Sequence, residues 1–101
     1  MEKFSFKNRY GLEVVGYVKI PENPIGLVFE EHGLGSFKEH PSVEAVTNTF
    51  FEKGYIVVNF DATNSVNESG GKYENATMGK HYEDLEDVIS WAKNQEWYRE
   101  P

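Results

Sequence analysis

The stretch Ile-Gly-Leu-Val-Phe-Glu-Glu-His-Gly-Leu-Gly-Ser-Phe-Lys, residues 25–38, decides the fold of this chain. Its apolar run predicts a strand over residues 25–32 that ends at His32. Gly33 and Gly35 follow and predict a tight turn into a helix, because glycine adopts backbone angles that other residues avoid. Unpaired backbone N–H groups in such a turn can bind an anion or a developing negative charge.

The segments before this stretch predict an antiparallel hairpin. Residues 3–7 alternate between polar and aromatic side chains, and residues 12–20 contain the strand-forming residues Val14, Val15, Tyr17, Val18 and Ile20. The turn signal Asn-Arg-Tyr-Gly, residues 8–11, lies between them. Pro21 and Pro24 then end the second strand, because proline supplies no donor to a sheet.

The segments after it predict a helix, a buried strand and a second helix. The first helix begins near Pro41 and ends at Gly54, with Val43, Val46 and Phe50 on one face. The nearly continuous apolar run over residues 55–60 is typical of a strand covered on both faces in a parallel sheet. A polar loop over residues 61–77 is long enough to indicate a functional loop. The predicted order is therefore β-β-β-α-β-α, an α/β fold.

The second helix has the clearest pattern. Thr77 is its expected N-cap, and the spacing predicts an apolar stripe consisting of Met78, Tyr82, Leu85, Ile89 and Ala92. Its acidic residues are expected to form a solvated face: Glu83, Asp84, Glu86 and Asp87. We expect His81, like His40, to be a surface or helix-face histidine without a catalytic role.

The composition narrows the classes of function. A chain of 101 residues forms at most one domain. The net charge of -7 argues against nucleic acid and anionic membranes as partners. With no cysteine, the chain has no disulfide and no thiolate nucleophile. We expect a cytoplasmic protein, because we find neither a signal-type apolar region nor a membrane-spanning stretch.

Three motifs follow one another along the chain: His-Gly-Leu-Gly-Ser-Phe-Lys-Glu at residues 32–39, Gly-Tyr-Ile-Val-Val-Asn-Phe-Asp at residues 54–61, and the Glu68-Ser69-x-Gly71 loop. Together they resemble the N-terminal half of an α/β-hydrolase, in particular the group of serine esterases, dienelactone hydrolases and serine aminopeptidases. The resemblance covers residues 1–101 as one partial domain. It implies a sheet with strand order 1-2-4-3 and a small acyl substrate, an ester or an amide, in the complete enzyme.

The resemblance also implies roles for the glycine turn. The backbone N–H of Leu34 would supply half of an oxyanion hole, and the second donor would follow the nucleophile. Gly33 and Gly35 would shape the turn, and His32 would brace it instead of acting as a base. We expect neither a cofactor nor a metal ion.

The sequence departs from the family pattern in three ways. Glu30 and Glu31 replace apolar strand residues, and burying either without a partner is costly. In the loop after Asp61 the usual glycines are missing, and we expect Asn67 to adopt a left-handed conformation in their place. No serine lies in a Gly-x-Ser-x-Gly elbow, and the nucleophile, acid and base are not in this sequence.

The missing elbow suggests that the chain acts as part of a larger assembly. The strand over residues 25–32 would be a bare sheet edge, and bare edges recruit partners. We therefore expect that edge to be completed by the C-terminal half of a hydrolase or by another copy of the chain. The sequence does not identify the substrate or the oligomeric state.

Three other interpretations compete. The first is a nucleotide-binding βαβ unit, in which Gly33 and Gly35 would begin a dinucleotide fingerprint and Asp61 would bind ribose, but Lys38 replaces the third glycine. The second is a metal site at Glu30 and His32, which alternation would place on one strand face, away from Glu31. The third is a non-catalytic binding module that keeps the hydrolase scaffold.

Overall fold

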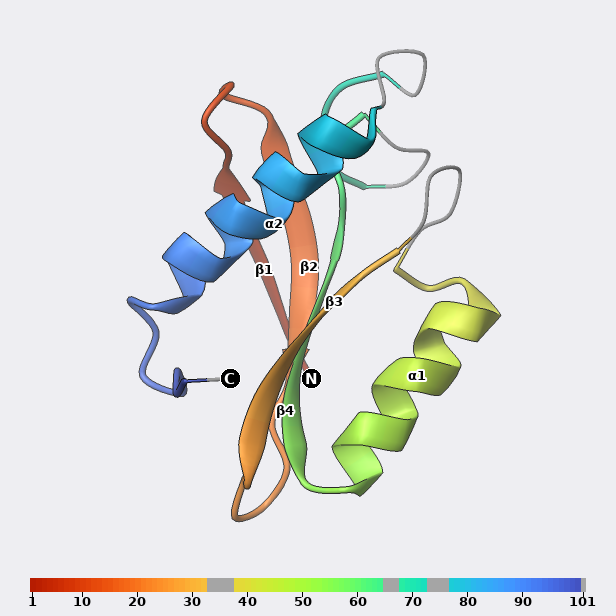
Figure 1. Cartoon of the computed structure of the whole chain (residues 1–101), viewed down its shortest axis with the longest axis vertical. Coiled ribbons are helices and arrows are strands. Elements are labelled where there is room, and N and C mark those ends of the chain that lie inside the picture. Colours follow the sequence, from red (N-terminus) through yellow and green to blue (C-terminus); the bar gives the residue numbers. More distant parts are fainter. Residues whose placement is uncertain (33–37, 65–67, 73–76, 101) are drawn as a thin grey trace.

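The computed structural model describes residues 1–32, 38–64, 68–72 and 77–100, without the side chain of Met78 (Figure 1). Its elements are β1 (Glu2–Lys7), β2 (Glu13–Lys19), β3 (Gly26–Glu31), α1 (Pro41–Glu52), β4 (Tyr55–Asp61) and α2 (Met78–Ala92). This order and the elements' bounds follow the sequence predictions within two residues.

The four strands form one mixed sheet in the order β1-β2-β4-β3. β1 and β2 form the predicted antiparallel hairpin, β2 also pairs antiparallel with β4, and β3 runs parallel to β4. The predicted strand order and the partial α/β-hydrolase architecture are confirmed. β3 is an edge strand of this sheet, and β1 forms the opposite edge.

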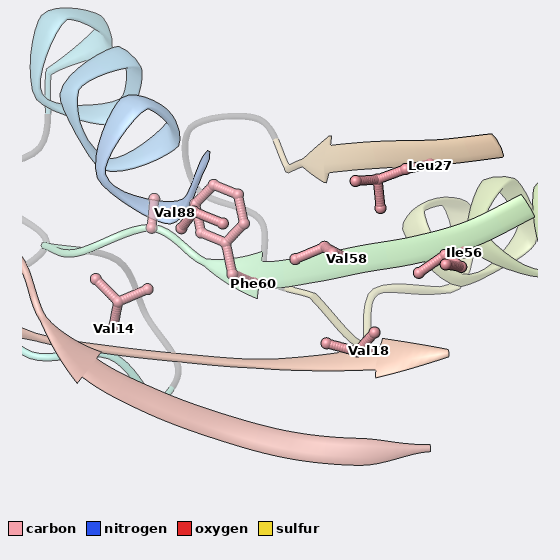
Figure 2. Close-up of a cluster of buried hydrophobic side chains, with 8 residues drawn as sticks. Val14, Val18, Leu27, Ile56, Val58, Phe60 and Val88 are labelled. Carbon is pink, nitrogen blue, oxygen red and sulfur yellow. The ribbon is translucent and has the colours of Figure 1, made fainter. Parts of the chain in front are cut away.

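The two helices cover opposite faces of the sheet (Figure 1). On β4, successive side chains alternate between the faces, so Asn59 reaches Thr47 of α1 while Phe60 packs into the core with Val88 of α2. Figure 2 shows Val88 beside Phe60. The core on the α2 side comprises Val14, Val18, Leu27, Ile56, Val58, Phe60, Ala62 and Val88. The run over residues 55–60 is apolar throughout because both of its faces are covered.

Three aromatic rings extend this core across the hairpin. The rings of Phe4 and Trp91 stack with centroids 4.1 Å apart, and Phe6 lies 5.6 Å from Trp91. Phe4 pairs in register with Gly16, where a Cβ would lie 2.5 Å from the Phe4 ring and 2.4 Å from the carbonyl oxygen of Asn59. The absence of a side chain at Gly16 therefore lets the Phe4 ring lie flat on β2.

The helix ends agree with their sequence signals. The Thr77 hydroxyl accepts a hydrogen bond from the backbone N–H of Lys80 at 3.1 Å, so the predicted N-cap of α2 is confirmed. Gly54 has a φ of 99° immediately after the C-cap of α1, the conformation for which glycine is preferred. Among the described residues, no helix is long and apolar enough to cross a membrane.

The predicted helix faces need correction. On α1, Val43 and Thr47 are buried, whereas Val46 and Phe50 are largely exposed. Thr47 replaces the expected apolar residue because its hydroxyl has two hydrogen-bond partners, the carboxylate of the half-buried Glu30 and the side-chain amide of the buried Asn59.

The stripe predicted for α2 is also displaced around the helix. Ala92 of the predicted stripe is buried and Leu85 packs against the core, but Tyr82 is exposed. The other buried positions are His81, Asp84 and Val88. The prediction that Asp84 belongs to a solvated face is therefore wrong, as is a surface position for His81. Asp84 can occupy this face because it accepts hydrogen bonds from Asn8 in the β1–β2 turn and from Thr63, which follows β4.

Candidate active site

The parallel strands β3 and β4 end side by side, and the residues that follow them form the candidate site. Ligands of open α/β sheets bind outside the carboxyl ends of the strands, so this is the expected position for chemistry. Three predicted site residues, Gly33, Leu34 and Gly35, lie outside the described residues. His32, the fourth, is described and is buried.

His32 is attached to the end of β4. Its Nε2 accepts a hydrogen bond from the backbone N–H of Ala62 at 2.9 Å. Because that nitrogen must present a lone pair, a neutral ring carries its proton on Nδ1. A ring held in this way has its Nε2 lone pair occupied by the hydrogen bond to the backbone after β4.

Lys38 and Asp61 form a buried ion pair that the sequence interpretation did not anticipate. The side chains of Lys38 and Asp61 are 2% and 0% exposed, and Lys38 Nζ lies 2.7 Å from Asp61 Oδ2. The ammonium group also lies 2.5 Å from Glu68 and 3.1 Å from Glu39. The sequence did contain a signal for this pair. Lys38 follows the two glycines after β3, and Asp61 is the last residue of β4, so both lie at the carboxyl ends of neighbouring parallel strands.

The electrostatics of this cluster follow from burial and pairing. Burial by itself lowers the pKa of Lys38, but hydrogen bonds to Asp61 and Glu68 outweigh it and raise that pKa above its usual value. Hydrogen bonds from Lys3 and Lys38 lower the pKa of Glu68 to about 2. Lys38 and Glu68 therefore both carry their charges at neutral pH.

The same carboxylates have the spacing of a cation site. One oxygen from each of Glu39, Asp61 and Glu68 falls within 4.8 Å of the others. Lys38 Nζ contacts all three carboxylates, so its ammonium group already supplies the positive charge. A metal ion would have to displace a buried lysine, and we assign none here.

The loop after β4 is tied to the sheet through Ser69. The Ser69 hydroxyl donates to the carbonyl oxygen of Asp61 at 2.6 Å and accepts from the backbone N–H of Val15 at 2.8 Å. Asn67, predicted to be left-handed, lies outside the described residues, but Asn64 in the same loop has a φ of 58°. Asparagine therefore does adopt a conformation in this loop that favours glycine.

A second buried carboxylate, Asp84, connects three parts of the chain. It accepts hydrogen bonds from the backbone N–H of Thr63 at 2.6 Å, from the Thr63 hydroxyl at 2.7 Å, and from the Asn8 side-chain amide at 2.9 Å. Asp84 thereby fixes α2 to the hairpin turn and to the residues after β4.

The two glutamates of β3 point to opposite faces, as predicted. Glu30 accepts a hydrogen bond from the Thr47 hydroxyl on the α1 side. Glu31 lies on the α2 side, with an oxygen 3.8 Å from His81 Nδ1, which is too long for a hydrogen bond. The idea that Glu30 and His32 share a face is wrong, because β3 ends at Glu31 and the His32 ring lies against His81, with centroids 5.7 Å apart.

Glu31 and His81 are the least satisfied polar groups among the described side chains. Neither ring nitrogen of His81 has a hydrogen-bond partner, nor does Glu31 Oε2. Burial, reinforced by the charge of Asp84, raises the pKa of Glu31 to about 7. Burial, reinforced by His32, lowers the pKa of His81. Both groups therefore favour their neutral forms.

A β1-β2-β4-β3 sheet covered by a helix on each face, with β3 running into a glycine-rich segment, defines an α/β-hydrolase fold. A family model described as X-Pro dipeptidyl-peptidase (S15 family) matches residues 14–100. The chain belongs to this family. The comparison with curated proteins finds no match to this sequence.

Solved structures agree on the fold. Est1E from Butyrivibrio proteoclasticus with bound ferulic acid has a TM-score of 0.81 and 22% identity, covering 95% of this chain and 39% of that chain. The Pyrococcus furiosus esterase Pf2001 has a TM-score of 0.79 and 22% identity, covering 94% and 37%. The α/β hydrolase GrgF from Penicillium sp. sh18 has a TM-score of 0.77 and 20% identity, covering 93% and 32%. The chain thus spans less than half the length of each of these proteins.

Proposed function

We propose that this chain supplies the N-terminal part of a serine hydrolase that cleaves ester or amide bonds of a small acyl substrate, and that it is inactive alone. The observation that carries the proposal is the S15 family match over residues 14–100, on a chain whose glycine-rich segment follows β3. The family description names a peptidase, and one of the similar structures, Pf2001, is described as an esterase. Both reactions are acyl transfers to water.

In this proposal the backbone N–H of Leu34 stabilises the oxyanion of the tetrahedral intermediate. A single such donor contributes roughly 3 to 4 kcal/mol to the transition state. His32 supports the proposal as a brace, because its hydrogen bond with Ala62 attaches the start of the segment to β4. Gly33 and Gly35 would allow the backbone to approach the substrate closely.

The nucleophile, the acid and the base come from outside these residues in this proposal. They would be supplied by a polypeptide that pairs with the edge strand β3, either a C-terminal half of a hydrolase or another chain. No cofactor takes part. The narrower assignment to the group of serine esterases, dienelactone hydrolases and serine aminopeptidases, and a cytoplasmic location, belong to the same proposal.

A fluorophosphonate probe, which labels activated serines, tests this function. The chain is treated with the probe alone, and again with the polypeptide that completes its sheet, whether that is encoded beyond Pro101 or copurifies with the chain. We expect labelling only of the completing polypeptide, at an elbow serine. No labelling in either sample would refute the hydrolase and favour a binding module.

A second comparison isolates the oxyanion donor in the completed enzyme. Leu34→Pro removes the backbone N–H, whereas Leu34→Ala keeps it and serves as the matched control. We expect Leu34→Pro to lower kcat by roughly 10²- to 10³-fold. Equal activity in the two variants would exclude this role for Leu34.

A further inference from the structure

A cavity of about 600 Å³ lies where three described segments meet at one end of the sheet. Figure 1 shows these segments together at the end toward which β4 runs. The side chains that line the cavity are Tyr10 and Leu12 from the β1–β2 turn, Asn64 and Lys72 from the loop after β4, and Lys80 and Glu83 from the first two turns of α2. A cavity of this size accommodates a small organic molecule. The proposed reaction assigns no role to any of these residues.

The wall of the cavity contains a buried amide with unused donors. Asn64 is 5% exposed, and its Oδ1 accepts a hydrogen bond from the backbone N–H of Lys72 at 3.1 Å. An N–H group donates only to the oxygen of an amide, so this contact also identifies Nδ2 as the other atom. Among the hydrogen bonds of the described residues, none involves Asn64 Nδ2. Because Asn64 lines the cavity, its two amide hydrogens are available to a molecule bound there.

The charges around the cavity favour an anion. Lys72 and Lys80 bring two ammonium groups to the lining and Glu83 brings one carboxylate, which leaves one positive charge. The Glu83 carboxylate is occupied, because it accepts from the Tyr10 hydroxyl at 2.7 Å and pairs with Arg9 at 3.2 Å. The lining is therefore positive on a chain whose net charge is -7. Such a local reversal of charge attracts an anionic ligand.

The β1–β2 turn supplies apolar surface that is held in place. The backbone N–H groups of Tyr10 and Leu12 donate to Asn8 Oδ1 at 2.9 and 3.0 Å. Tyr10 is 58% exposed, yet its hydroxyl is fixed by Glu83. An exposed aromatic ring that is already ordered contacts an apolar group at little cost in conformational entropy. The cavity thus combines a fixed ring and an aliphatic side chain with donors for an anion.

We propose that this cavity binds a small organic carboxylate with an apolar body. Asn64 Nδ2 and the Lys72 ammonium group donate to the carboxylate oxygens, and hydrogen bonds to a charged acceptor are the stronger kind. The body of the ligand lies against Tyr10 and Leu12. A bare inorganic anion would leave those two side chains without a contact. This inference does not depend on the proposed hydrolase function, because the site uses none of its catalytic groups.

Isothermal titration calorimetry on the 101-residue chain tests the site with phenylbutyrate as the probe. The neutral amide of phenylbutyrate and inorganic phosphate are titrated in parallel. We expect phenylbutyrate to bind at least about tenfold more tightly than its amide, and more weakly at high salt. We also expect its NMR shift changes to be centred on Leu12, Gly71 and Lys80, which line the cavity. No binding, equal binding of the amide, or phosphate binding as tight as that of phenylbutyrate overturns the proposal.

Variants of the two donors connect the binding to this cavity. Asn64→Asp keeps an oxygen for the Lys72 N–H and tolerates the φ of 58°, but it replaces the amide donors with negative charge. We expect Asn64→Asp to weaken phenylbutyrate binding by at least about tenfold. Asn64→Gly, which also adopts this φ, is measured in its place if Asn64→Asp does not fold, with a loss of about tenfold expected. Unchanged affinity in the measured Asn64 variant contradicts the assignment.

A pair of lysine variants supplies the matched control. Lys72→Met removes the ammonium group but keeps an unbranched apolar stem, and we expect about threefold weaker binding because the lysine is exposed. Lys53→Met removes the same charge from an exposed lysine at the end of α1, outside the cavity lining, and should leave binding unchanged. Equal losses in the two variants would show that only net charge matters, and the proposed site would then be wrong.

Discussion

Replacing Glu31 with glutamine should remove a pH-dependent loss of stability from this protein. The Glu31 side chain is 16% exposed and has an oxygen without a hydrogen-bond partner, beside His81 and near the charge of Asp84. Burial, together with Asp84, raises the pKa of Glu31 from 4.5 to about 7. The folded protein therefore binds this proton more tightly than the unfolded chain does.

The sign and size of this change in stability follow from the raised pKa of Glu31. A raised carboxyl pKa contributes stability that is complete below the unfolded value of 4.5 and is lost as the pH rises through about 7. At ~1.4 kcal/mol for each unit, the loss approaches about 3 kcal/mol. Glutamine imitates the protonated carboxyl and does not titrate. The lowered pKa of His81 destabilises the folded state as the pH falls. This contribution is the same in the wild type and in Glu31→Gln, because both contain His81, so it cancels from the difference between them.

Urea unfolding followed by the fluorescence of Trp91 and Trp97, which pack on the core, measures the effect. We expect Glu31→Gln to match the wild type at about pH 4, below the unfolded pKa of Glu31, and to exceed its free energy of unfolding by about 3 kcal/mol near pH 8.5. Glu22→Gln, at an exposed carboxylate, is the control and should show no such trend. A Glu31→Gln difference that is the same at both pH values would refute the reasoning.

Three further changes test the packing. Phe60→Ala should lower the free energy of unfolding in urea by about 3 to 5 kcal/mol, because the ring is 0% exposed, and Phe60→Leu should cost clearly less. Gly16→Ala should cost at least about 1 to 3 kcal/mol, since the new Cβ would lie 2.4 Å from the carbonyl oxygen of Asn59; an unchanged thermal midpoint would contradict this close approach. Asp84→Ala should cost about 2 to 4 kcal/mol and speed amide exchange at Thr63, whose N–H and hydroxyl both lose their acceptor; the opposite result, full protection at Thr63, would show that another group accepts these bonds.

The fold was predictable because its signals are local. The run over residues 55–60 is apolar throughout, which indicated a strand covered on both faces, and Gly54 and Thr77 marked two helix ends. None of these inferences needed knowledge of a distant residue. The assignment to the α/β-hydrolases came from the resemblance of the three motifs at residues 32–39, 54–61 and 68–71 to that family.

The buried polar contacts were not predictable in the same way. Lys38, Asp84 and His81 belong to residue types that are usually exposed or only half-buried, so a search for apolar positions does not select them. Lys38 and Asp84 are buried because their partners arrive from distant segments, such as Asp61 for Lys38. A pattern read along one element does not contain those partners, and the stripe on α2 was misplaced for this reason.

The position of β3 at the edge of the sheet makes the alignment of any added strand decisive. Side chains on a strand change face with every residue, so sliding the incoming strand by a single residue would turn its nucleophile to the opposite side of the sheet. An enzyme assembled across the edge of β3 would lose its activity through such a shift in register, although the backbone hydrogen bonds between the strands would remain. Correct alignment at β3, and not affinity alone, would therefore decide whether an assembled molecule is active.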